Sequence, residues 1–137
     1  MNRKRRWSNC VVIAAILLAG FGAANLIDDF LYCIPAELGL SNATGQILTV
    51  IYFIITSILL VLAARASQSG YLGNLGLGIF LIVAEIAKHG PEGLFAGTWR
   101  SGSLSRILAG GLMLSAIVLI VVSYQAWRYA KHQAHLD

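Results

Sequence analysis

Long apolar runs separated by short polar breaks dominate this sequence. Four of the runs are close to the roughly 20 residues that an α-helix needs to cross the hydrocarbon core of a bilayer. They predict helices over about residues 8–32, 45–64, 71–89 and 104–127. We therefore expect an all-α integral membrane protein, in which residues 1–137 form a single four-helix transmembrane domain.

Composition supports a membrane protein over a soluble one. Hydrophobic residues make up 58% of the chain and charged residues 12%, whereas soluble domains carry about 25% charged residues. The first apolar run resembles a secretory signal that would be cleaved before Asn25. That run is long for a signal core and its apolar character resumes after the break, so we expect the first helix to be retained.

The basic residues indicate how the helices are inserted. Arg3, Lys4, Arg5 and Arg6 directly precede the first apolar run, which is the pattern of an insertion signal and not of a nucleic-acid-binding face. Seven basic residues fall on the side of the termini, against three on the other side. This bias predicts a multi-pass protein of the cell membrane with both termini cytoplasmic. It also makes membrane lipid an expected partner and nucleic acid an unexpected one.

A break follows the third predicted helix. The Gly90-Pro91 pair is expected to end that helix. Residues 92–96 are too few to cross a bilayer, so we expect a short segment lying at the membrane interface, anchored by Phe95 and Trp99.

The two halves of the chain show a weak internal similarity. A shift of 56 residues places Gly20 on Gly76, Gly22 on Gly78, Asp29 on Glu85 and Pro35 on Pro91. The match raises the hypothesis of a tandem repeat, in which two helical hairpins are inserted in the same orientation. It would place Asp29 and Glu85 at matching depths.

Charged side chains gather at the predicted end of the bundle away from the termini. Glu85, Lys88 and His89 share one helical face, because they lie three and four residues apart. Ionised groups near hydrocarbon are expensive and need partners. The candidate polar cluster consists of Asp28, Asp29, Glu85, Lys88, His89 and Arg100.

Three interpretations of this cluster stay open at the sequence level. It is an interfacial ion-pair network that fixes the helix register, or a pocket for an ion, proton or small solute with Asp29 and Glu85 as its deepest acids. Alternatively, Glu85 and His89 bind a metal together with Asp28 or Asp29, although Lys88 would repel the cation. The network is the interpretation that we favour, and we expect no metal.

No motif of a known type of catalytic site occurs in the sequence, so we expect neither an enzyme nor a cofactor. Small residues recur on the first predicted helix (Ala15, Ala19 and Ala23) and on the fourth (Ala109 to Gly111). Such faces let membrane helices approach closely. We therefore expect a structural or accessory protein that associates with itself or with another membrane protein. The alternatives are a small-solute or proton transporter that uses Asp29 and Glu85, and a metal-binding membrane protein.

Overall fold

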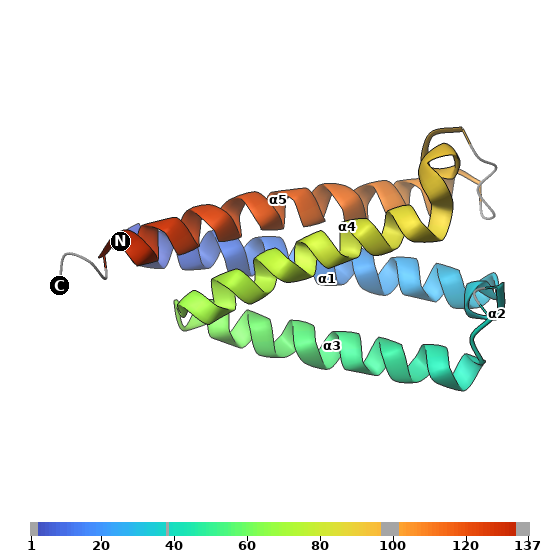
Figure 1. Ribbon diagram of the computed structural model, residues 1–137, viewed down its shortest axis with the longest axis horizontal. Coiled ribbons are helices and arrows are strands. Elements are labelled where there is room, and N and C mark those ends of the chain that lie inside the picture. The colour runs from blue at the N-terminus through green and yellow to red at the C-terminus, as the bar shows by residue number, and fades with distance from the viewer. Residues whose placement is uncertain (1–2, 38, 97–101, 134–137) are drawn as a thin grey trace.

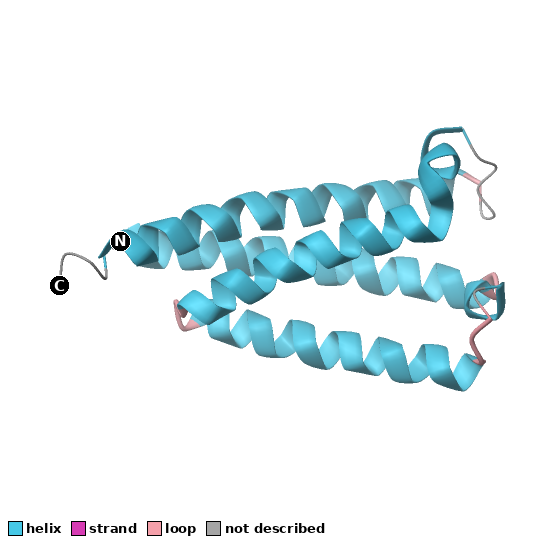
Figure 2. Cartoon of the chain, in the orientation of Figure 1, coloured by secondary structure: helices cyan, strands magenta, loops and turns pink. Residues whose placement is uncertain are grey.

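The structure, a computed structural model, describes residues 3–37, 39–96 and 102–133. All regular secondary structure in this part of the chain is helical (Figure 2). The elements in order are α1 (Arg3–Leu31), α2 (Ile34–Glu37), α3 (Asn42–Ala64), α4 (Gln68–Ala96) and α5 (Ser103–Gln133). Within the described ranges four helices, α1, α3, α4 and α5, are long and apolar enough to span a membrane. This confirms the predicted all-α class with four membrane-spanning helices.

The spanning helices extend beyond the boundaries that hydropathy predicts. α3 begins at Asn42 because the hydroxyl of Ser41 accepts a hydrogen bond from the Thr44 amide at 3.0 Å, which caps the helix. α5 similarly continues to Gln133 instead of ending near 127. Apolar runs mark where hydrocarbon ends, whereas helical hydrogen bonding continues into the polar layer beside it.

The end of α4 differs from the expectation. We predicted that this helix ends at His89 and is followed by a separate segment over 92–96, but α4 continues to Ala96. A proline removes one backbone hydrogen bond and crowds the preceding turn, so it can bend a helix without ending it. Figure 1 shows the last turns of α4 at a steep angle to the rest of the helix. Their position at the membrane interface stays a prediction, and Trp99 lies outside the described residues.

The helices alternate in direction, and the start of α1 lies at the same end as the end of α5 (Figure 1). α5 packs extensively against both α1 and α4, whereas α3 contacts α4 and α1 over less of its length. The first two spanning helices therefore do not form a self-contained hairpin. Neither the grouping into two hairpins nor the tandem repeat is confirmed.

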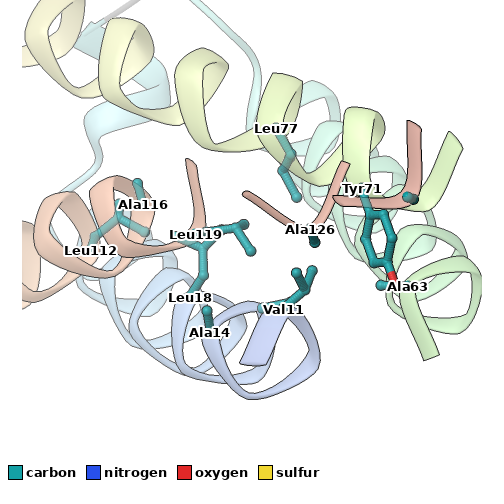
Figure 3. Close-up of a cluster of buried hydrophobic side chains, with 12 residues drawn as sticks. Val11, Ala14, Leu18, Ala63, Tyr71, Leu77, Leu112, Ala116, Leu119 and Ala126 are labelled. Carbon is teal, nitrogen blue, oxygen red and sulfur yellow. The ribbon is translucent and has the colours of Figure 1, made fainter. Parts of the chain in front are cut away.

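The closest packing joins α1 to α5 and uses small residues from both helices. Ala14 and Ala15 of α1 and Ala116 of α5 are almost completely buried. The ring of Phe21 covers Gly111 so closely that a β-carbon there would overlap the ring. Figure 3 shows Ala14 and Leu18 close to Leu119 in this interface. From the two small-residue faces, Ala15 and Ala109 are thus buried within the chain, whereas a β-carbon on Gly110 would meet nothing within 4 Å. Binding of a second molecule through these faces stays a prediction.

α3 is the least buried of the four spanning helices. Large aliphatic side chains project from it away from the bundle, among them Ile47, Val50, Ile54 and Ile58. Water would make such a surface unfavourable, but lipid tails are as apolar as these side chains. The exposed face of α3 therefore fits a hydrocarbon environment.

Two glycines of α4 provide a test of the α3–α4 contact. A β-carbon on Gly70 would lie 2.5 Å from the backbone nitrogen of Ala63, whereas one on Gly76 would have nothing within 4 Å. We expect Gly70→Ala to lower the free energy of unfolding by about 1–3 kcal/mol through overpacking. Gly76→Ala, the matched control, should raise it by about 0.5–1 kcal/mol through helix propensity. Unfolding in detergent, followed by circular dichroism, measures the free energy of unfolding of both variants. Equal changes in the two variants would contradict the close α3–α4 contact at Gly70.

Candidate functional site

Lys88 connects two carboxylates at the end of the bundle away from the termini. Its ammonium donates hydrogen bonds of 2.8 and 2.9 Å to the two carboxylate oxygens of Asp29 on α1. The same Nζ lies 3.4 Å from Oε1 of Glu85, one turn earlier on α4. The Lys88, Asp29 and Glu85 side chains are only 11%, 16% and 6% exposed. These three residues, called here the ion-pair cluster, join α1 to α4.

The neighbouring aspartate faces a different helix. Asp28 is buried, and Ser105 at the start of α5 donates a hydrogen bond of 2.5 Å to its Oδ2. Consecutive residues on a helix point about 100° apart, since 3.6 residues complete one turn. The pair Asp28-Asp29 therefore binds α1 to α5 through one side chain and to α4 through the other.

The arrangement satisfies charges that hydrocarbon could not accommodate. An ion pair in a low-dielectric environment gains little net free energy, because desolvation offsets the attraction between its charges. Removing one member is far more costly, since the other charge then stays buried without its partner. The expectation that the cluster fixes how α1 meets α4 therefore stays a prediction.

A groove of about 650 Å³ lies between α1, α3 and α4 and includes the cluster at one end. Asp29, Glu85 and Lys88 all line it, together with the side chain of Asn25. Most of the remaining lining is aliphatic, aromatic or glycine. The site thus combines a compact set of charges with a long apolar wall.

The structure brings together most, but not all, of the residues that the sequence singled out. Asp29, Glu85 and Lys88 share one cluster, while Asp28 lies beside it and turns toward α5. The side chain of His89 and the whole of Arg100 fall outside the described residues, so their expected membership stays a prediction. Among the side chains that the structure does describe, no three His, Cys, Asp or Glu residues gather as a metal site. The metal-binding alternative thus gains no support.

Sequence reasoning missed a second group of buried polar residues near the other end of the bundle. Asn74 is completely buried and donates hydrogen bonds to the carbonyl oxygens of Leu59 at 3.0 Å and Gly70 at 2.8 Å. Ser8 donates one of 2.6 Å to the carbonyl of Ala63. The sequence does indicate Asn74 as a candidate buried residue, because it lies eleven residues before Glu85 and therefore on the same face of α4. The role of Ser105 had no such signal, because its partner is far away in the sequence.

Comparison with known proteins leaves the site to be interpreted from its own chemistry. The chain matches no protein family, no curated protein and no solved structure.

Replacing Lys88 tests the ion-pair cluster. We expect Lys88→Met to lower the free energy of unfolding by about 3–5 kcal/mol, because two buried carboxylates lose their shared partner. Asp29→Asn should cost less, since Glu85 still neutralises the ammonium. Unfolding in detergent gives both values.

Arg106→Met is the matched control for this measurement, because Arg106 is an exposed cation at the same end of the bundle. Its effect should stay within about 0.5 kcal/mol. A Lys88→Met protein as stable as this control would show that the ion pairs contribute nothing to the fold.

Proposed function

We propose that this chain is a non-catalytic membrane protein with a structural or accessory role. The observation that carries the proposal is the bridging of Asp29 and Glu85 by Lys88. Charges that neutralise one another in the resting structure hold helices in register, which is what a scaffold requires. A partner in this role is a second copy of the chain or another membrane protein.

The proposal includes an orientation in the cell membrane, with both termini cytoplasmic. The excess of basic residues on the side of the termini supports it. The ion-pair cluster then lies inside the bundle at the end that faces the outer surface. Labelling of cysteines introduced at Ser67 and Ser103 from either side of the membrane checks this orientation.

The burial of α1 supports a retained first helix. Val11, Ala15 and Leu18 are almost completely buried in the core. Cleavage before Asn25 would remove all three and expose the facing surface of α5. The mature protein is therefore proposed to begin before α1.

The accessory role predicts a defined assembly. A tagged chain solubilised in mild detergent should elute with a mass above that of the monomer, because it carries a second copy or one specific partner. Light scattering and mass spectrometry of the eluted complex measure this. An unrelated tagged four-helix membrane protein from the same host is the control. A monomer with only the control's background proteins would contradict the proposal.

A transporter is the second candidate, and one observation favours it. Asp29 and Glu85 both line the groove, so a solute in the groove would meet their carboxylates. If the chain moves protons, proteoliposomes should dissipate a pH gradient, and Glu85→Gln or Asp29→Asn should slow this at least tenfold. Asp28→Asn is the matched control, because Asp28 does not line the groove. If proteoliposomes with the wild-type protein dissipate the gradient no faster than empty liposomes, the transporter hypothesis is contradicted.

A further inference from the structure

One face of α5 is uncovered along the second half of the helix. Ile117, Val121 and Tyr124 on this face are 48%, 49% and 45% exposed. Arg128 and Lys131, further along the helix, are exposed as well. The five residues follow one another at intervals of four and three, so they form a single row. This row is called here the outer α5 face.

The outer α5 face changes in character along its length. Ile117 and Val121 are aliphatic, Tyr124 is amphipathic, and Arg128 and Lys131 are cationic. A phospholipid changes in a matching order, from its acyl chain through the interfacial region, where Tyr is enriched in membrane proteins, to its phosphate. The row covers about 21 Å at a rise of about 1.5 Å per residue. One leaflet with its headgroups is about 20–22 Å thick, so the lengths agree.

Two aromatic rings position the cations at the end of this face. The Arg128 guanidinium carbon lies 5.7 Å from the centre of the Tyr124 ring. The Lys131 ammonium lies 5.5 Å from the centre of the Trp127 ring. A ring face attracts a cation but does not neutralise its charge. The salt bridges in the described part of the chain all belong to Lys88, so neither cation has a carboxylate partner there.

The end of the bundle that carries these cations is basic throughout. Exposed Arg5 and Arg6 of α1 and Arg65, which follows α3, lie at the same end. The acids that the structure describes belong to the opposite end (Figure 1): Asp28, Asp29, Glu37, Glu85 and Glu92. Asp137 lies outside the described residues, and with it the sequence still places seven basic residues and one acid on this side.

We propose that the outer α5 face binds one anionic phospholipid. The phosphate lies at Arg128 and Lys131, whose N–H groups donate charge-assisted hydrogen bonds to its oxygens. An acyl chain follows Val121 and Ile117 toward the middle of the bilayer. The assignment requires only that α5 spans a membrane, and it is independent of the accessory and transport roles.

The same charges disfavour a second copy of the chain on this face. Two copies inserted in the same orientation would bring Arg128 and Lys131 of one protomer beside the same residues of its partner, and these like charges repel. A phosphate replaces that repulsion with attraction. Charge complementarity therefore selects an anionic lipid as the occupant.

Native mass spectrometry of the delipidated full chain tests the proposal. The probes are phosphatidylglycerol, which is anionic, and phosphatidylcholine, which is zwitterionic, with identical acyl chains and each titrated separately. We expect one phosphatidylglycerol to bind about tenfold more tightly than phosphatidylcholine. Equal binding, or tighter binding of phosphatidylcholine, would overturn the proposal.

A matched pair of arginine variants locates the bound lipid. Arg128→Gln removes one of the two proposed phosphate ligands and should weaken phosphatidylglycerol binding about fivefold. Arg65→Gln removes an exposed cation at the same end, beside α3, which does not contact α5, and should leave binding within about twofold. Equal losses in the two variants, or a delipidated dimer that binds no phosphatidylglycerol, would contradict a site on the outer α5 face.

Discussion

The interaction on which the arrangement depends is the pairing of Lys88 with Asp29 and Glu85. A low-dielectric environment cannot solvate these charges, so the helices that carry them must bring them together. α1 and α4 otherwise touch very little, because both pack mainly against α5. The ion-pair cluster therefore links two helices that apolar packing leaves nearly separate, and it does so at one end only.

The groove lies beside the helices that pack closely, because α1 and α4 both pack mainly against α5. Alanines and glycines bring α1 and α5 together, and Gly78 lets α4 approach Ile120 of α5. At the end that carries the cluster, α3 packs its Gly45 against Phe30 and Pro35. Glycines on the three surrounding helices, Gly22, Gly45, Gly73 and Gly76, all line the space that remains. Of these four glycines, Gly76 alone would leave a β-carbon with nothing within 4 Å, whereas the other three are covered by side chains of neighbouring segments.

Hydrogen bonds to backbone carbonyls hold α3 at the opposite end. Ser8 bonds to Ala63 in the last turn of α3, where helical carbonyls have no partner within the helix. Asn74 bonds to the carbonyl of Leu59. α3 is therefore held by hydrogen bonds near the termini of the chain and by the packing of Gly45 against Phe30 and Pro35 near the ion-pair cluster.

The sequence by itself determined the class of this protein, its four spanning helices and the end at which Asp29, Glu85 and Lys88 gather. These properties follow from the lengths of apolar runs and from the cost of charge in hydrocarbon, which are local. Only the tertiary structure decided that α1 packs chiefly on α5, that Asp28 bonds to Ser105 and that α4 continues past Pro91. Helices in a membrane are nearly equally apolar on all sides, so hydropathy does not specify neighbours, which are chosen by the shapes and polar groups of distant segments.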